Sequence, residues 1–150
     1  MSTWDVQLEE TFRRAFDKLP QYEQAVMVAA IEKVLGELGH EVCSTEWGKS
    51  LGDGLFEFRV RKSLRAIHDE FKESGADIPD LPSGSNRDVL LRAFFTVHGD
   101  RIVLLLHVYD KKRDPSEKRQ QREIKKARKQ LRAWREREKR AAALKRKGRA

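Results

Sequence analysis

The feature that most constrains the fold is a pair of β-rich runs, residues 89–97 and 101–109, joined by a short turn. Both runs are rich in leucine, β-branched and aromatic side chains, and Gly99-Asp100 separates them. Two such runs around a glycine-containing dipeptide are typical of a two-residue β-hairpin. The sequence therefore predicts an antiparallel hairpin at the centre of the fold.

A turn at Gly99-Asp100 would also fix the register, and it would make Arg92 a direct cross-strand neighbour of His107. Side chains directly opposite one another share a sheet face. The wholly apolar face, which would be the floor of the core, would comprise Leu91, Ala93, Phe95, Val97, Ile102, Leu104, Leu106 and Val108. The mixed face would comprise Arg92, Phe94, Thr96, Val103, Leu105, His107 and Tyr109.

Helical spacing of apolar residues precedes this hairpin. The apolar positions from Leu8 to Leu19 lie on one face of a first predicted helix, and those from Met27 to Leu38 on one face of a second. Pro20 lies between the two helices, and Gly39 would be a left-handed C-cap. We expect these helices to form an αα-hairpin on the sheet. A weak alternation over residues 3–6 allows a short first strand.

Residues 51–54 have turn chemistry, and the next run, residues 55–61, alternates between apolar and charged side chains. Its apolar side would be buried, and its other side would point outward. Residues 62–88 are interpreted as an insertion, with a short amphipathic helix near residues 64–71 and an exposed loop from Gly75 to Asp88.

A final helix is predicted from Asp114, Pro115 and Glu117, which suit its capped first turn. A narrow apolar stripe would dock it on the domain, formed by Ile124, Ala127, Leu131 and Trp134. We predict a domain over residues 1–135, including the insertion, and a basic tail over residues 136–150 that is a projecting helix end or disordered.

Charge is divided unevenly along the chain. Residues 1–110 hold 13 Lys and Arg against 19 Asp and Glu, a net charge of −6, whereas residues 111–150 hold 19 against 5, a net charge of +14. This asymmetry favours a polyanionic partner, either a nucleic acid or an acidic protein surface, although a solvated helix gives the same pattern.

The remaining composition narrows the class of protein. Cys43 is the only cysteine, so an intrachain disulfide is excluded, which suits a cytoplasmic location. The first ten residues lack a basic region followed by an apolar one, so we expect no signal peptide. No apolar run reaches the roughly 18 residues of a membrane helix, and no membrane partner is expected.

The mixed face of the hairpin is the candidate site. Arg92, His107 and Tyr109 gather at its turn-distal end, and Lys111 and Lys112 follow at the strand exit. The outward face of the other strand carries two more cations, Arg59 and Arg61. Arginines can hold a phosphate and stabilise developing charge, while His, Tyr or Lys can transfer protons. No metal-ligand spacing, phosphate loop or nucleophile elbow is visible, so no metal or cofactor is expected.

Two ordered segments resemble the RelE/ParE toxin superfamily, most closely its phage-derived HigB-like branch. Residues 49–59 (KSLGDGLFEFR) resemble its strand motif, and residues 102–112 (IVLLLHVYDKK) resemble its later strand and lysine pair. Asp114-Pro115, Glu123-Ile124 and Ala127 match the opening of its last helix. The resemblance covers roughly residues 4–61 and 89–134.

The resemblance implies a small antiparallel sheet between an N-terminal helical hairpin and a C-terminal helix. It also implies the toxin of a type II toxin–antitoxin system, a metal-independent mRNA endoribonuclease (mRNA interferase) acting on the ribosome. There the ribose 2′-hydroxyl attacks the adjacent phosphate. The expected partners are mRNA, the ribosome and a cognate antitoxin, a helix-turn-helix protein with an acidic segment that buries the basic patch.

Carried over to this chain, the resemblance implies that Arg59 and Arg92 hold the phosphate. Lys111 and Lys112 would stabilise charge or transfer protons, and the acid, base or base-stacking groups would come from His107 and Tyr109. The surrounding RNA-binding cations would be Lys49, Arg61, Arg113, Arg119 and Arg122. Which residue is the general base stays open.

The sequence departs from the family pattern at three places: the insertion over residues 62–88, Val108 in place of a common glycine, and Arg113 in place of a common threonine. The insertion could cover the site, redirect its specificity or accompany loss of activity. Two alternative functions therefore stay open. One is a ParE-like toxin that inhibits DNA gyrase by binding, and the other is a non-enzymatic nucleic-acid-binding module driven by the basic tail.

Overall fold

The computed structural model describes residues 3–71 and 81–148, which form one five-stranded sheet with helices on both of its faces. The elements are β1 (Asp5–Leu8), α1 (Glu10–Asp17), α2 (Gln21–Ala30), a π-helical turn (Ile31–Leu35), α3 (Gly36–Leu38), a 3-10 segment (Gly39–Ser44), β2 (Gly48–Gly52), β3 (Leu55–Val60), α4 (Leu64–Glu70), β4 (Leu91–His98), β5 (Ile102–Asp110) and α5 (Glu117–Gly148). The α+β fold class expected from the sequence is confirmed.

The strand order is β1-β5-β4-β3-β2. Strands β3 to β5 pair antiparallel, as expected, and β2 pairs antiparallel with β3, whereas the short edge strand β1 runs parallel to β5. Strand β2 was not predicted from the sequence, because its residues Gly48–Gly52 carry little of the alternation that marks a half-buried strand. It is an edge strand whose side chains are mostly exposed.

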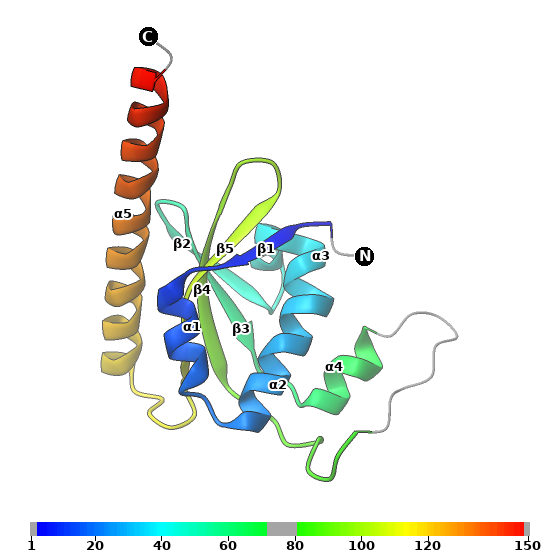
Figure 1. The fold of residues 1–150 in the computed structure, drawn as a ribbon. Helices are drawn as coiled ribbons and strands as arrows, with labels where there is room; N and C mark the ends of the chain where they lie inside the picture. The colour runs from blue at the N-terminus through cyan, green and yellow to red at the C-terminus, as the bar shows by residue number, and fades with distance from the viewer. Residues whose placement is uncertain (1–2, 72–80, 149–150) are drawn as a thin grey trace.

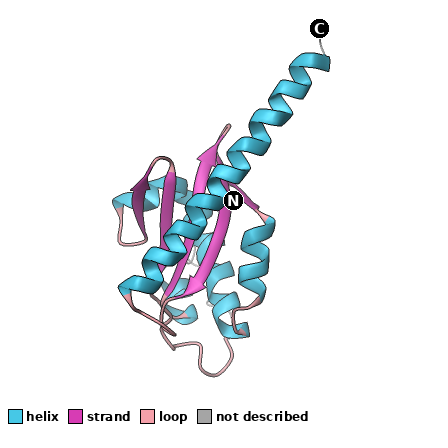
Figure 2. Ribbon diagram, turned by 90° about the vertical axis from the view of Figure 1, so that its left-hand side faces the viewer, coloured by secondary structure: helices cyan, strands magenta, loops and turns pink. Residues whose placement is uncertain are grey.

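The sheet separates two unequal layers (Figures 1 and 2). Helices α1, α2 and α4 pack on one face of the sheet, where the large core cluster lies. We call it the hairpin face, after the helical hairpin of α1 and α2. The long helix α5 covers the opposite face, which we call the α5 face, over a smaller cluster. Both faces are therefore buried, so the expectation that Glu57 and its neighbours point outward is wrong: Glu57 has 0% exposure.

The predicted helical hairpin is confirmed, with two exceptions among its apolar positions. Leu8 belongs to the end of β1 rather than to α1, and it is 38% exposed. Val28 is 43% exposed on α2. Gly39 ends α3 with a positive φ of 56°, and a Cβ there would overlap the Trp4 ring. This close approach of Trp4 explains why a glycine is needed at the end of the helix.

The β4–β5 register differs from the predicted one because the turn holds three residues, not two. His98 pairs with Ile102, and Arg101 in the loop has a positive φ of 57°. One extra loop residue shifts the partner strand by one position, and such a shift exchanges its two faces. Leu104 consequently packs in the α5 cluster and Leu105 in the hairpin-face cluster, opposite to the expectation.

A β-bulge between Phe94 and Phe95 shifts the β4–β5 register by one more residue, so the strand faces beyond it are again the predicted ones. Phe95 pairs with Leu105 but Phe94 pairs with His107, so Leu106 is the extra residue. His107 and the following strand end therefore return to the predicted mixed face. The predicted contact between Arg92 and His107 is nevertheless wrong, because Arg92 pairs with Tyr109.

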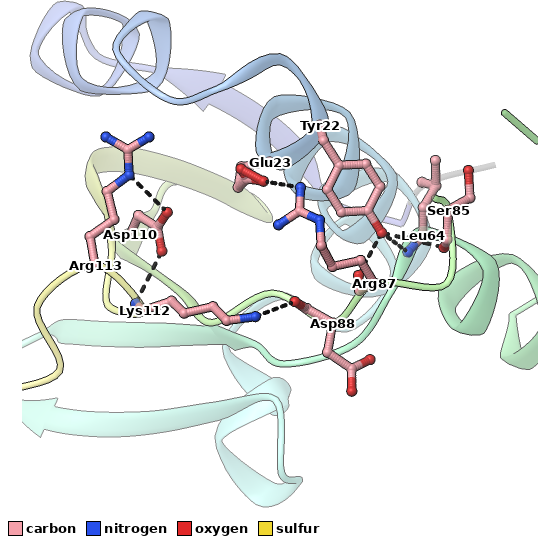
Figure 3. A network of polar contacts seen from close by, with 9 residues as sticks. All are labelled: Tyr22, Glu23, Leu64, Ser85, Arg87, Asp88, Asp110, Lys112 and Arg113. Atoms are coloured by element: carbon pink, nitrogen blue, oxygen red, sulfur yellow. Dashed lines mark hydrogen bonds and ion pairs between the residues drawn. The ribbon is translucent and has the colours of Figure 1, made fainter. Parts of the chain in front are cut away.

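The described part of the insertion packs on the hairpin face, away from α5. Its predicted short helix is confirmed as α4, which buries Leu64 and Ile67. Part of the predicted loop, residues 75–80, lies outside the described residues. The rest is tied to α2 (Figure 3): the Tyr22 hydroxyl donates to the carbonyl of Arg87 at 2.6 Å and accepts from the Leu64 amide at 3.2 Å.

Helix α5 begins two residues later than predicted, and it continues to Gly148, so the projecting helix end is the alternative that the structure confirms for residues 136–148. Ser116, not Asp114, caps it, since the Ser116 hydroxyl accepts from the Arg119 amide at 3.1 Å. The expected inner stripe is confirmed, with Ala127 and Leu131 buried. Residues 136–148 continue the helix with every side chain exposed, and this end projects beyond the sheet (Figure 2). None of the helices in the described ranges has the length and apolarity needed to cross a bilayer.

Candidate active site

The α5 face brings together side chains from three neighbouring strands. Arg59 on β3 pairs with Arg92 on β4, and Arg92 pairs with Tyr109 on β5. These three residues form a row across the sheet, which we call the arginine row. The next row behind it consists of Glu57, Phe94 and His107. Four of the six predicted catalytic residues, Arg59, Arg92, His107 and Tyr109, therefore lie in two adjacent rows.

The carboxylate of Glu57 holds the two arginines. Its Oε1 accepts from the Nε of Arg59 at 2.7 Å and lies 3.7 Å from the Nε of Arg92. Burial of a carboxylate is costly unless it is paired, and two guanidinium groups supply that pairing. Glu57 is thus the residue that fixes both arginines on one side of the sheet, a role that we did not assign from the sequence.

Arg92 is almost fully buried, with 3% exposure, and it is under-satisfied. Its Nε and one terminal nitrogen are buried without a hydrogen-bond partner among the described residues, as is Oε2 of Glu57. Burial, together with the charges of Arg59 and Arg61, lowers the pKa of Arg92, and Glu57 opposes that shift. Buried donors without acceptors are unusual in folded proteins, and they leave Arg92 able to bind an anionic oxygen.

Tyr109 lies at the β5 end of the arginine row. Its ring is parallel to that of Phe94, with centroids 6.1 Å apart, and the Arg119 guanidinium lies 5.2 Å from its centre. Burial, with a smaller contribution from Glu57, raises the pKa of Tyr109 to about 12. The phenol is therefore protonated at neutral pH, and its hydroxyl is buried with no partner in the described chain. Such a group is a proton donor, not a base.

His107 connects the sheet to α5. Its Nε2 contacts Oε2 of Glu123, and Oε1 of Glu123 accepts from the Nε of Arg119 at 3.0 Å. Burial lowers the pKa of His107 despite the opposing effect of Glu123. Burial acts to raise the pKa of Glu123, but its contacts with His107, Arg119 and Lys126 outweigh burial and lower it. The pair is therefore a neutral imidazole donating to a carboxylate.

The two lysines that follow β5, Lys111 and Lys112, have different partners. The Nζ of Lys111 donates to Gln120 at 3.0 Å, and burial with the charges of Arg92 and Arg59 lowers the pKa of Lys111, so it belongs to the site. The Nζ of Lys112 instead donates to the carbonyl of Asp88 at 3.2 Å (Figure 3).

The predicted RNA-binding cations are distributed over several surfaces. Arg61 is exposed just past β3 and lowers the pKa of Arg92, so it lies near the arginine row. Lys49 is exposed on β2 opposite Glu57. Arg113 pairs with Asp110 at 3.7 Å (Figure 3), and Arg119 is engaged by Glu123. The fifth, Arg122, is exposed on the outer side of α5.

A cavity of about 430 Å³ adjoins this face between α1, the end of β5 and α5. His107, Tyr109 and Glu123 line its inner wall, and Lys18 and Lys126 contribute cations. Its lining is mixed, and its charged side chains are mostly basic, so the cavity can receive an anion or a nucleotide next to Tyr109. Within residues 3–71 and 81–148, no group of three or more His, Cys, Asp or Glu side chains could hold a metal ion.

Two residues of the site escaped the sequence analysis although weak signals existed. Glu57 precedes Arg59 by two positions, so both lie on one face of a strand. Glu123 precedes Ala127 and Leu131 at four-residue intervals, so it shares their inward helix face. An acid inside an apolar stripe indicates a buried partner, here His107.

Comparison with known proteins adds little to this picture. No family model and no curated protein sequence matches the chain. Among solved structures, the chain is similar to the toxin–antitoxin complex RelBE2 from Mycobacterium tuberculosis, with 18% sequence identity and a TM-score of 0.44. The match covers 71% of this chain and 96% of that one. We draw no functional conclusion from a likeness of this degree.

Proposed function

We propose that this chain is the toxin of a type II toxin–antitoxin system and that it cleaves mRNA on the ribosome without a metal ion. The observation that carries the proposal is the arginine row, in which Arg59, Arg92 and Tyr109 lie side by side on three strands and Glu57 holds both arginines. The two sequence segments that resemble RelE/ParE toxins, with the HigB-like branch as the nearest, supply Arg59 and Tyr109.

In the proposed reaction the ribose 2′-oxygen forms a bond to phosphorus, and the bond from phosphorus to the 5′-oxygen of the next nucleotide breaks. Arg59 and Arg92 bind the non-bridging oxygens, whose charge increases in the transition state. Tyr109, protonated at neutral pH, donates its proton to the departing 5′-oxygen. Lys111 adds positive charge at the strand exit. The base that removes the 2′ proton stays unassigned.

Access to the arginine row is asymmetric. The Arg59 side chain is 22% exposed, whereas that of Arg92 is 4% exposed beneath α5. The scissile phosphate would therefore enter from the Arg59 end, next to Arg61 and Lys111. A cognate antitoxin with an acidic segment would block the same entrance by binding these cations, and we expect a helix-turn-helix protein in that role.

The test is RNA cleavage in a cytoplasm-derived translation extract, with cut sites mapped on a defined mRNA. Arg59→Ala should lower the cleavage rate by about 10²–10³, as loss of one charge-stabilising donor does in other active sites. Arg65→Ala is the matched control, because Arg65 is exposed on α4 on the hairpin face. Its cleavage rate should equal that of the wild type.

Intact transcripts at high concentrations of wild-type protein would refute the proposal. Inhibition of DNA supercoiling without RNA cleavage would instead select the ParE-like alternative, in which the chain acts on gyrase by binding. Equal cleavage by the Arg59→Ala and wild-type proteins would remove the arginine row from the reaction.

A further inference from the structure

The outer side of α5 carries a continuous row of cations. Lys118, Arg122, Lys125, Lys129 and Arg132 follow one another at intervals of four and three residues, which places them on one side of the helix. All five are exposed. We call them the basic stripe. It covers about 21 Å along the helix axis, and Lys139 and Arg146 extend its line over the projecting end.

The basic stripe is not neutralised by the chain itself. None of its five side chains forms a hydrogen bond or ion pair with another residue of the described ranges. Glu123 is the only acid between Lys118 and Arg135, and it faces inward to His107. Like charges four residues apart destabilise a helix by roughly 0.2–0.5 kcal/mol per pair, so this arrangement gains stability from a bound polyanion.

The chemistry of the surface selects among polyanions. Apart from Ala133, the side chains that lie between the stripe residues on the outer side are polar or charged, and Trp134 turns inward against His98 with ring centroids 4.7 Å apart. The apolar side chains that a stable protein interface or an interfacial membrane helix would bury are almost missing there. Single-stranded nucleic acid would require aromatic stacking platforms. Contacts to phosphates of a double helix require only a rigid row of cations.

The inner side of α5 fixes the direction of the stripe. Arg128 donates to the carbonyl of Leu51 at 2.5 Å, and Arg135 donates to the carbonyl of Asp53 at 2.8 Å, so the helix is held on the β2–β3 turn. Arg137 also pairs with Glu9 at 2.9 Å, at the start of α1. A helix anchored in this way presents its cations in a preformed line, which reduces the entropy lost on binding.

We propose that the basic stripe binds the phosphate backbone of double-helical RNA, and that it is a docking surface separate from the arginine row. The choice of RNA over DNA rests on the proposed function, in which the substrate is presented by a structured RNA assembly. The stripe and the projecting end together extend about 44 Å, comparable to the roughly 16 base pairs that other duplex-RNA modules cover.

The experiment measures binding of the full chain to a labelled RNA duplex of about 16 base pairs by fluorescence anisotropy, at several salt concentrations. Lys125→Glu with Lys129→Glu should weaken binding by at least about tenfold near 0.15 M salt and reduce the salt slope by about two. Arg13→Glu with Arg65→Glu is the control with the same change in net charge, since both residues are exposed elsewhere. The control should change affinity by less than about threefold.

Equal losses in the two double variants would overturn the proposal, because net charge alone would then explain the binding. Tighter binding to single-stranded RNA, to a DNA duplex, to polyglutamate or to phosphatidylserine vesicles would also overturn it. If circular dichroism shows that the charge-reversed variant has lost helix α5, Lys125→Gln with Lys129→Gln takes its place. This neutral double variant should also bind the RNA duplex more weakly than the wild type does. If the protein does not cleave mRNA but still binds duplex RNA through the basic stripe, the proposed function is refuted and the proposal for the basic stripe stands.

Discussion

The two faces of the sheet differ in what they bury. The hairpin face packs aromatic and aliphatic side chains such as Phe12, Phe58 and Phe95 into one large cluster. The α5 face buries a smaller apolar cluster together with Glu57, Arg92 and other polar groups that lack hydrogen-bond partners within the described ranges. Apolar burial stabilises the fold, whereas buried groups without partners cost free energy.

This difference indicates that the hairpin face stabilises the fold and that the α5 face carries the functional groups. Unsatisfied polar groups persist in a folded protein only where the remaining packing compensates for them, and they concentrate at functional sites. The hairpin face supplies the stability that lets the α5 face keep Arg92 and the Tyr109 hydroxyl available for a ligand. The two faces can be compared directly, because neighbouring residues of β4 point to opposite sides.

The largest effects are expected from Phe94→Ala and Phe95→Ala. Both side chains have 0% exposure, and each substitution should lower the free energy of unfolding by about 3–5 kcal/mol through lost burial and a cavity. Urea denaturation measures this loss. Only Phe94→Ala should also reduce cleavage per folded molecule, because Phe94 supports the rings of His107 and Tyr109. Equal specific activity of the two folded variants would contradict the division between the faces.

The two tyrosines should respond to removal of their hydroxyls with opposite signs. Tyr22→Phe should lower the free energy of unfolding by about 1–3 kcal/mol, because the Arg87 carbonyl loses its donor and the Leu64 amide its acceptor. Tyr109→Phe should raise it by about 1 kcal/mol, because its buried hydroxyl has no partner in the described chain. The same variant should cleave RNA more slowly. Thermal unfolding of both variants tests the pair, and destabilisation by Tyr109→Phe would contradict our account of the α5 face.

Acidification should weaken the α5 face through His107 and Glu123. The folded-state pKa of His107 lies below its ordinary value of 6.5, so the unfolded chain binds more protons there and stability falls as the pH drops below about 6.5. Glu123 has a lowered pKa too, so its contribution is present above about 4.5 and is lost further into acid. Unfolding measured from pH 8 to pH 4 should show this decline, and His107→Gln should flatten its upper part. An unchanged slope in that variant would contradict the assignment.

The smallest effect on stability is expected from truncation after Arg135. Residues 136–148 are exposed, and among the described residues the truncation removes one surface ion pair with the domain, between Arg137 and Glu9. Such pairs contribute about 0–1 kcal/mol, so the melting temperature should barely change. Affinity for duplex RNA should fall as cations of the projecting end are removed. A large loss of stability would show that the projecting end belongs to the folded domain.

Much of the fold follows from the sequence because local patterns encode it. Helical spacing predicts the hairpin helices and the inner stripe of α5, and alternation predicts β3. Two β-rich runs around a glycine-containing turn predict β4 and β5. The register of β5 does not follow, because it depends on Arg101 adopting a positive φ and on a bulge at Leu106. Neither choice has a distinct pattern in the residues themselves.

The candidate site divides in the same way. The types of its residues were predictable, since Arg59, Arg92 and Tyr109 stand in strands with recognisable patterns. Their partners depend on packing between elements distant in the sequence. Glu57 is buried between two arginines, Arg59 on its own strand and Arg92 on β4, and His107 is held by Glu123 from a helix 16 residues later.

Helix α5 also has a mechanical consequence. Residues 117–135 are held on the domain, and Arg137 is paired with Glu9 just beyond them. The 13 residues from 136 to 148 extend about 20 Å and are all exposed. Figure 1 shows this end of α5 projecting past the sheet. The docked part from Glu117 to Arg135 covers roughly 28 Å and is longer than the free end. A tilt of about ten degrees moves the tip by about 3 Å. Because Glu123 belongs to the same helix, a tilt of α5 would also move Glu123 relative to its partner His107 on β5.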